Sequence, residues 1–260
     1  MSGRLDPELL AQAETRLEAL RARIAGACTR AGRDPSEIIL VGACKRQPVE
    51  RIAAVVCAGL DQLGENYVQA AQATQAALRA CLEAHFPAAP VPQPSWRMIG
   101  HLQRNKASQA VDVFGCVDTV DNPRLARALA GRAEAAGVEL EICLQVNLSG
   151  ESTKSGCSEA ELEDLLSACS ALPALRVVGL MTMPAPGPAP ESARDTFARL
   201  RGLRDTLQLE PGGTGLQHLN MGMSADLEVA IEEGATVVRV GSDLFGERTP
   251  ASPGLGQKTP

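Results

Sequence analysis

The segment Ile38-Ile-Leu-Val-Gly-Ala-Cys-Lys45 places a lysine directly after a short apolar run. A run of this length is typical of a buried parallel strand. Lysine is rare in this chain, with four in 260 residues. An ammonium that loses hydration beside a buried strand tends toward the neutral amine, which is the form that condenses with an aldehyde. Lys45 is therefore a candidate Schiff-base residue, although a strand-end lysine considered alone is more commonly exposed.

Apolar runs and helical stretches alternate along the whole chain. The runs that we expect to form strands cover residues 38–43, 60–63, 96–99, 113–117, 140–146, 177–181, 216–219 and 236–240. The stretches with helical periodicity cover residues 5–31, 49–58, 67–84, 102–110, 123–136, 159–172, 190–209 and 224–233. Eight alternating units within about 250 residues predict an α/β fold, a single TIM-like (β/α)₈ barrel with an extra N-terminal helix.

The predicted barrel forms one domain over residues 1–248. Two Pro-rich stretches, residues 86–94 and 184–190, are expected to be surface loops, and residues 249–260 are expected to form a disordered tail. A doubly wound parallel sheet is the main alternative, because the sequence pattern alone does not show whether the sheet closes.

Composition and cysteine spacing exclude several classes of protein. The net charge of -6 argues against a general nucleic-acid binder. The eight cysteines form no C-x-x-C pattern, so we expect neither a zinc site nor a disulfide framework. No signal peptide and no apolar run long enough to cross a membrane is evident, so we expect a cytoplasmic protein without membrane contact.

Two loops of the predicted barrel have the composition of an anion site. Asn220-Met-Gly-Met-Ser224 follows the seventh strand, and Arg239-Val-Gly-Ser242 includes the end of the eighth. Glycine lets the backbone approach a ligand, and backbone amides at a helix start or in a nest bind anions. Ser224 taken singly fits a plain helix cap and Gly241 an ordinary turn. Their joint position after strands seven and eight favours phosphate.

In a closed barrel the first strand lies beside the eighth, so Lys45 would share a cavity with the phosphate site. A reactive amine near a phosphate cradle suits pyridoxal 5′-phosphate. Arg239 could then hydrogen-bond the pyridine nitrogen, where a cation disfavours protonation and makes the ring a weaker electron sink. The alternative for Arg239 is a structural ion pair with a neighbouring carboxylate.

The spacing of these residues also resembles a known family. The segments that carry the resemblance are Lys45 with its strand, Gly64-Glu-Asn-Tyr-Val-Gln69, Ile99-Gly-His-Leu-Gln-Arg-Asn-Lys106, Gln145-Val-Asn147, Lys154-Ser-Gly156, Gly179-Leu-Met181, Met221-Gly-Met-Ser224, Val238-Arg-Val-Gly241 and Phe245-Gly246. Their order over residues 38–248 resembles the pyridoxal phosphate homeostasis protein family. This family is similar to the N-terminal barrel of alanine racemase, which is pyridoxal phosphate fold type III.

The resemblance implies a role for each candidate residue. It implies a cofactor aldimine on Lys45 and places Asn66 near the cofactor ring and Arg239 at the pyridine nitrogen. The residues that it places at the phosphate are Ser224, Gly241 and Ser242, and Met223 is included beside them, although methionines at strand ends commonly fill core gaps. The chain departs from the family at Cys44, Leu63 and His101, where serine, phenylalanine and proline are usual. Cys44 raises the hypothesis of redox sensitivity or of a thiohemiacetal side reaction beside an aldehyde.

The expected function is that of a pyridoxal phosphate binding protein in vitamin B6 and amino-acid homeostasis, with no catalytic residues and no metal. Its expected partners are the cofactor and pyridoxal phosphate-dependent apoenzymes, and we expect a monomer. The alternative is a racemase-type enzyme. Racemisation on two faces of the α-carbon needs a second acid or base, which the resemblance places on a tyrosine from another domain. Here the sole tyrosine is Tyr67, on the same barrel. A class I aldolase would need no phosphate cradle.

Overall fold

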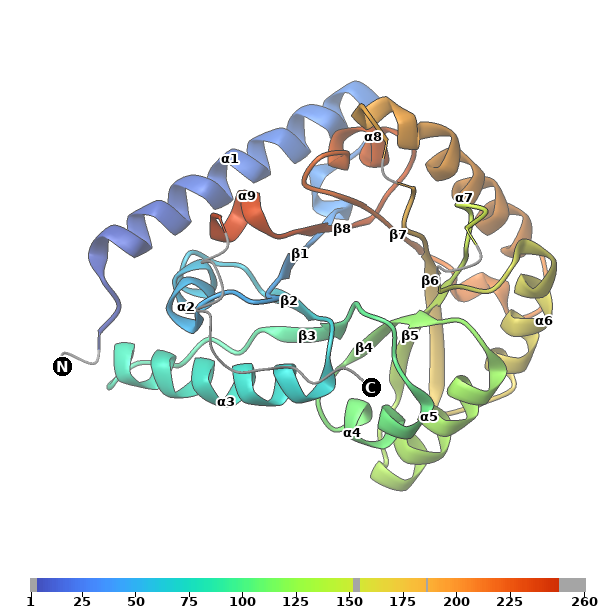
Figure 1. Cartoon of the computed structure of the whole chain (residues 1–260), viewed down its shortest axis with the longest axis horizontal. Coiled ribbons are helices and arrows are strands. Elements are labelled where there is room, and N and C mark those ends of the chain that lie inside the picture. The colour runs from blue at the N-terminus through green and yellow to red at the C-terminus, as the bar shows by residue number, and fades with distance from the viewer. Residues whose placement is uncertain (1–3, 152–154, 186, 248–260) are drawn as a thin grey trace.

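The computed structural model describes residues 4–151, 155–185 and 187–247, so the expected tail lies outside the described residues. Its strands form one closed parallel barrel in chain order (Figure 1). The strands are β1 (Ile39–Ala43), β2 (Gln62–Glu65), β3 (Ser95–Met98), β4 (Cys116–Val120), β5 (Leu140–Gln145), β6 (Leu175–Met181), β7 (His218–Met223) and β8 (Val237–Val240). The predicted barrel is therefore confirmed.

Helices surround this barrel. The α-helices are α1 (Pro7–Ala31), α2 (Val49–Cys57), α3 (Val68–His85), α4 (Ala107–Val111), α5 (Pro123–Ala136), α6 (Glu159–Ser170), α7 (Arg194–Leu207), α8 (Leu227–Glu232) and α9 (Ser242–Phe245). Short 3₁₀ turns are η1 (Pro35–Glu37), η2 (Arg104–Lys106), η3 (Pro190–Ala193) and η4 (Gly213–Gly215).

Pairing between the first and last strands closes the barrel. Ile39 lies opposite Val237 and Gly42 opposite Val240 in a parallel register. A doubly wound sheet would leave two edges, so this pairing excludes the alternative. Closure also makes neighbours of the segments that follow β1 and β8, which are far apart in sequence.

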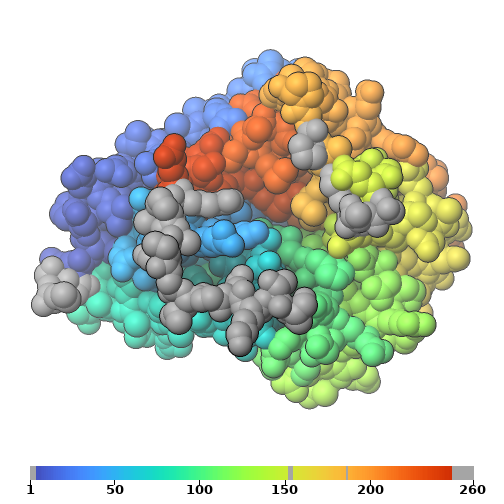
Figure 2. Space-filling model, viewed as in Figure 1, coloured from blue at the N-terminus to red at the C-terminus, as the bar shows by residue number. Residues whose placement is uncertain are grey.

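The N-terminal helix α1 is long because both of its ends are capped. The Asp6 side chain accepts a hydrogen bond from the Glu8 amide, and Gly32 ends the helix in the left-handed conformation at φ 65°. One face buries Leu17, Leu20 and neighbouring apolar residues. Figures 1 and 2 show α1 running along one side of the barrel, next to the C-terminal segment around α9. This helix therefore covers the seam where the barrel closes.

Strands β4 and β7 begin later than the sequence pattern predicts. The predicted strand 113–117 is shifted because the Val113 and Phe114 amides both donate to the Ala110 carbonyl, completing the turn after α4. The last pairing of β7 is irregular between Asn220 and Met223, where Gly222 has φ 94°. A bulge of this kind extends the strand past its apolar run and re-aims the residues that follow.

The helix after β7 also begins later than expected. The prediction that Ser224 opens a helix is wrong, since α8 starts at Leu227. The Asp226 carboxylate accepts a 2.6 Å hydrogen bond from the Met223 amide, and the Asp226 amide donates to the Met223 carbonyl at 3.1 Å. These two bonds hold residues 223–226 in a turn, and the helix can begin only after it.

Candidate functional site

Lys45 lies in a tight turn directly after β1. The Gln47 amide donates to the Cys44 carbonyl at 2.9 Å, which closes the turn around the lysine. Arg46 has φ 59°, and among the described residues it is the only non-glycine residue with a positive φ. Such a conformation is uncommon for a side chain of this size and is found where surrounding structure enforces it. The turn leaves Lys45 half-buried at the mouth of the barrel.

Cys44 points away from the mouth and into the protein. Its side chain is 1% exposed, and its thiol donates to the Gly42 carbonyl at 3.4 Å. Burial, together with the nearby Glu65 carboxylate, raises the pKa of the Cys44 thiol well above its usual range. A buried protonated thiol is a poor nucleophile. This geometry argues against the thiohemiacetal and redox hypotheses for Cys44.

Asn66 and Glu65 lie at the end of β2, beside the lysine turn. Glu65 is buried, and its carboxylate accepts a 3.0 Å hydrogen bond from the Asn66 amide. Burial raises the pKa of Glu65, while the Asn66 hydrogen bond and the positive charge of Lys45 oppose this shift. The carboxylate therefore fixes the Asn66 backbone and places a negative charge near Lys45.

The turn after β7 presents Met223 and Ser224 at the same end of the barrel. Met223 is 40% exposed, so it is not a core residue, and Ser224 is half-buried. The Met223 amide is already bonded to Asp226, so it is not a donor for an anion. Burial raises the pKa of Asp226, and the hydrogen bond from Met223 and the charge of Arg239 oppose the shift.

The segment after β8 has room for an added carbon atom at Gly241. A Cβ added there would lie 3.8 Å from the nearest atom, the Ala43 carbonyl oxygen. Ser242 follows as the first residue of the short helix α9 and is exposed, with its hydroxyl directed to the Asp243 carboxylate at 3.4 Å. The room beside the glycine and the adjacent hydroxyl are the features that an anion cradle needs.

Arg239 extends from β8 into the barrel and is 5% exposed. Its guanidinium donates to the Asn220 side-chain oxygen and, at 3.3 Å each, to the Asn220 and Thr182 carbonyls. These are neutral acceptors, so the alternative of a direct ion pair is not what the structure shows. Burial lowers the pKa of Arg239, although the more distant Asp118 and Asp226 carboxylates counteract the shift.

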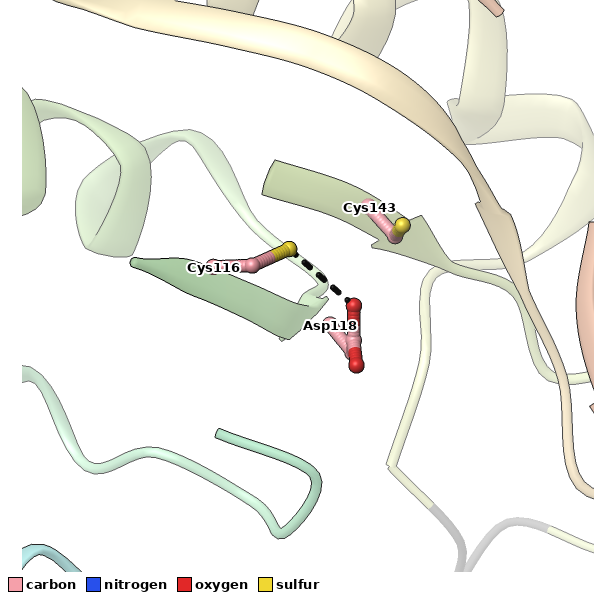
Figure 3. A group of neighbouring side chains, drawn as sticks. All are labelled: Cys116, Asp118 and Cys143. Atoms are coloured by element: carbon pink, nitrogen blue, oxygen red, sulfur yellow. Dashed lines mark hydrogen bonds between the residues drawn. The ribbon is translucent and has the colours of Figure 1, made fainter. Parts of the chain in front are cut away.

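A second buried polar cluster lies deeper in the barrel. The Arg97 guanidinium donates to both Asp118 oxygens, at 2.6 and 3.0 Å. The Cys116 thiol donates to one of these oxygens at 3.2 Å (Figure 3). The ligand atoms of Cys116, Asp118 and Cys143 lie within 4.8 Å of one another, a spacing compatible with a metal ion. The bidentate bonds of Arg97 occupy the carboxylate, and its charge repels a cation, so this cluster is an ion pair rather than a metal centre.

The described part of the chain has cavities at both ends of the barrel, and only one of those discussed next lies at the end that holds the candidate residues. A cleft of about 290 Å³ lies at the ends of β2 and β3 and is lined by Asn66, Tyr67 and Lys106 among others. A larger cavity of about 580 Å³ lies at the opposite end, near Ile38 and Asp61. The candidate residues do not line the larger cavity, and chemistry in such barrels belongs to the carboxyl ends of the strands.

The fold brings the predicted residues together at one end of four adjacent strands. Lys45 follows β1, Asn66 follows β2, and Arg239 lies on β8; the phosphate candidates Met223, Ser224, Gly241 and Ser242 follow β7 and β8. Sequence reasoning missed the partners that hold them: Asn220, Thr182, Asp226, Glu65 and the Arg97–Asp118 pair. Asn220 and Glu65 stand in segments quoted above and carried a signal. Asp226 acts through a turn bond to Met223, and Thr182 and the Arg97–Asp118 pair depend on contacts between distant parts of the chain.

Comparison with known proteins gives consistent matches over most of the chain. The model of the alanine racemase N-terminal domain matches residues 15–249. A Pseudomonas aeruginosa protein named pyridoxal phosphate homeostasis protein is 41% identical over 232 residues, covering 89% of this chain and 94% of the relative. An Aquifex aeolicus protein of the same name is 40% identical over 233 residues, covering 90% and 97%.

Solved structures agree with these matches. PipY of Synechococcus elongatus, in a structure with PLP bound, is 32% identical and has a TM-score of 0.76, covering 90% of this chain and all of that one. No helix within the described residues is both long and apolar enough to span a lipid bilayer.

Proposed function

Because the chain belongs to the pyridoxal phosphate homeostasis protein family, we propose that it binds pyridoxal 5′-phosphate at the mouth of its barrel. In this role the protein holds and releases the cofactor and takes part in vitamin B6 and amino-acid homeostasis. The ligand occupies the carboxyl ends of β1, β2, β7 and β8, where the structure gathers the candidate residues.

The proposal depends most on Arg239, which is buried without a directly bonded carboxylate. A buried cation without a directly bonded carboxylate is costly, so its presence calls for a ligand that uses it. Arg239 is 5% exposed, and its hydrogen bonds go to the neutral oxygens of Asn220 and Thr182. A pyridine nitrogen is a neutral acceptor that such a guanidinium can serve without an ion pair.

The residues present fit the cofactor at two further points. A carbon atom added at Gly241 would meet only ordinary van der Waals contacts, so the backbone there is accessible to an approaching group, as the proposed phosphate requires. The buried Asn220 amide nitrogen has no hydrogen-bond partner within the described part of the chain, and a bound polar ring would satisfy it directly or through water. Ser224 and Ser242 lie in the segments after β7 and β8 and supply hydroxyls that can donate to a phosphate.

Bound pyridoxal phosphate supplies an aldehyde that bonds to an amine and a ring that withdraws electrons. Lys45 provides the amine, held in place by the strained turn at Arg46. Asn66, positioned by the bond from its amide to Glu65, would lie beside a bound ring. Arg239 would place a positive charge at the pyridine nitrogen, which would disfavour its protonation and leave the ring a weak electron sink.

This arrangement favours a carrier without catalytic turnover, which acts alone as a monomer and passes the cofactor to dependent apoenzymes. Racemisation needs an acid or base on each face of the substrate. The chain has one tyrosine, Tyr67, which is 61% exposed at the start of α3. With a weak electron sink and its sole tyrosine in so exposed a position, the chain gives little support to proton removal from an amino acid.

The proposal is tested by locating the cofactor on the chain. The purified protein, loaded with pyridoxal phosphate and treated with borohydride, should carry the pyridoxyl mass on the peptide that contains Lys45. Lys45→Ala should lose both the mass and the visible absorption band. A label found chiefly on Lys106 or Lys154 would show that the assignment is wrong.

The carrier role is tested separately by exchange at the α-carbon. Alanine and serine incubated with the loaded protein in D₂O should show no inversion at rates typical of enzymes, as followed by NMR. Inversion at such rates that disappears in Lys45→Ala would favour the racemase-type alternative.

A further inference from the structure

Arg23 of the N-terminal helix contacts both loops of the proposed phosphate cradle. Its Nε and Nη2 donate to the two Glu228 oxygens at 2.7 and 3.1 Å, and its Nη1 donates to Asp243 at 2.7 Å. Nη2 also donates to the Ser224 carbonyl at 2.9 Å. One guanidinium therefore joins α1 to the turn after β7, to α8 and to the start of α9.

These bonds fix the parts of the chain that face the ligand. The bond to the Ser224 carbonyl orients the peptide of a predicted phosphate residue, in a turn that is not part of a helix. The bond to Asp243 holds the residue that follows Ser242. Arg23 lies 201 and 220 residues away from these two partners in the sequence, so it adds a long-range link between the loops to the pairing of β7 with β8.

Arg23 also balances the charge beside the cradle. Glu228 and Asp243 are carboxylates near the proposed position of a phosphate, and both would repel it. Arg23 pairs with both of them, and its hydrogen bond is the main cause of the lowered pKa of Glu228. About a third of the Arg23 side chain is exposed, at 34%. Solvent screens ion pairs of this kind, so the geometric role outweighs the electrostatic one.

We propose that Arg23 is a positioning residue for the phosphate end of the cofactor site, acting through the Ser224 carbonyl and Asp243. The inference rests on the proposed function. It assigns the N-terminal helix a role in cofactor retention that acts through contacts with the cradle loops.

The chain offers a matched control for this role. Arg30 lies on the same helix and pairs with Glu232 of α8 at 2.8 Å. It links the same two helices but has no recorded bond to the loops after β7 or β8 in the described part of the chain. Arg30→Gln therefore removes a helix–helix ion pair and leaves the cradle contacts in place.

The test compares affinities for two aldehydes in three proteins. Equilibrium titrations with pyridoxal phosphate and with pyridoxal are made on the unmodified protein, Arg23→Gln and Arg30→Gln. Arg23→Gln should weaken pyridoxal phosphate binding by about tenfold, the factor that corresponds to roughly one net hydrogen bond to a charged group. Pyridoxal affinity should not change, and Arg30→Gln should match the unmodified protein. Arg23→Lys, which keeps the charge but lacks the fork, should recover only part of the loss.

A second readout needs no cofactor. Hydrogen exchange of the amides at residues 222–226 and 241–244 should be faster in Arg23→Gln than in Arg30→Gln, because local opening tracks the lost contacts. Equal exchange in the two variants, or an equal loss of affinity for both aldehydes, would overturn the role of Arg23. If the unmodified protein binds pyridoxal as tightly as its phosphate, the phosphate cradle itself is wrong and the inference fails with it.

Discussion

Arg97 and Arg239 are both buried in the barrel, but different partners hold them. Arg97 forms a bidentate pair with Asp118, which is wholly buried. Arg239 bonds to the neutral oxygens of Asn220 and Thr182. The pKa values move in opposite directions as a result: the Asp118 charge raises that of Arg97 against the effect of burial, whereas burial lowers that of Arg239.

This difference in partners indicates that Arg97 stabilises the fold, whereas Arg239 is available to a ligand. A buried ion pair that is complete needs nothing else, and it holds β3 to β4. A buried cation that is only partly satisfied carries an unfavourable solvation term that a ligand can remove. The comparison therefore indicates which arginine to disturb for stability and which to disturb for binding.

The largest expected effect comes from removing Arg97. Arg97→Met leaves Asp118 as an unpaired buried carboxylate, and we expect the free energy of unfolding to fall by about 3–5 kcal/mol. Urea denaturation measures this change. The double variant Arg97→Met with Asp118→Leu should recover most of it, because neither charge is then left alone. A loss below about 1 kcal/mol in the single variant would break the distinction between the two arginines.

Removing Arg239 should reduce stability less than removing Arg97 and should mainly reduce cofactor affinity. Arg239→Met takes away a cation that bonds directly to no carboxylate, so its loss of unfolding free energy should be smaller than that of Arg97→Met. Affinity for pyridoxal phosphate should fall by about ten- to a hundredfold, because a buried hydrogen bond at the ring is lost. Parallel urea and binding titrations on both variants check this. A larger destabilisation than in Arg97→Met would mean that Arg239 is structural.

The cradle hydroxyls should affect only the phosphate. Ser224→Ala or Ser242→Ala removes a donor to a charged group and should weaken pyridoxal phosphate binding by about tenfold or somewhat more. Pyridoxal binding should be unchanged, since it lacks the phosphate. Titration of each variant with both aldehydes measures the ratio. If both affinities dropped together, the serines would be supporting the fold near Arg239 and not the cradle.

The smallest expected effect concerns how stability depends on pH, to which the carboxylates near the two arginines, Asp118 and Asp226, should contribute with opposite sign. Asp118 has a pKa below its usual value, so its contribution to stability is present above that usual value and is lost as the pH falls through the lowered one. Asp226 has a raised pKa, so its contribution is present below the usual value and is lost as the pH rises through the raised one. Asp226→Asn should therefore be relatively more stable at pH 6 than at pH 4 when compared with the unmodified protein by urea denaturation. The same sign for Asp118→Asn would contradict the comparison.

Much of the fold could be predicted from the sequence, because each apolar run and each helical period is a local signal. The errors lie where a hydrogen bond between residues three or four positions apart overrides the apolar pattern. The strand predicted at 113–117 was wrong because a turn after α4 takes up Val113, and the helix predicted at Ser224 was wrong because the Asp226 side chain bonds back to Met223. Neither bond has a signature in apolar periodicity.

The candidate site could be predicted in outline because barrels place chemistry at the carboxyl ends of their strands. Lys45, Asn66 and Arg239 are found there without exception. The partner of Arg97 could not be predicted, because it depends on the register of β3 and β4, in which Arg97 lies opposite Cys116. Arg23 gave no signal either, since a polar residue on a surface helix is ordinary and its contacts lie more than two hundred residues away.

The position of α1 has a consequence for how the protein is made. The ribosome synthesises this helix well before its partners α8 and α9 and before β8, the strand that closes the barrel against β1. Arg23 therefore gains Glu228 as a partner before it gains Asp243, and β1 has no β8 beside it until residues 237–240 have been added. A nascent chain that stops before β7 therefore exposes two edges of an open sheet, on β1 and β6, together with the face of α1 that α8 covers. The proposed cofactor site is complete only once β7, β8 and the segments after them have been added.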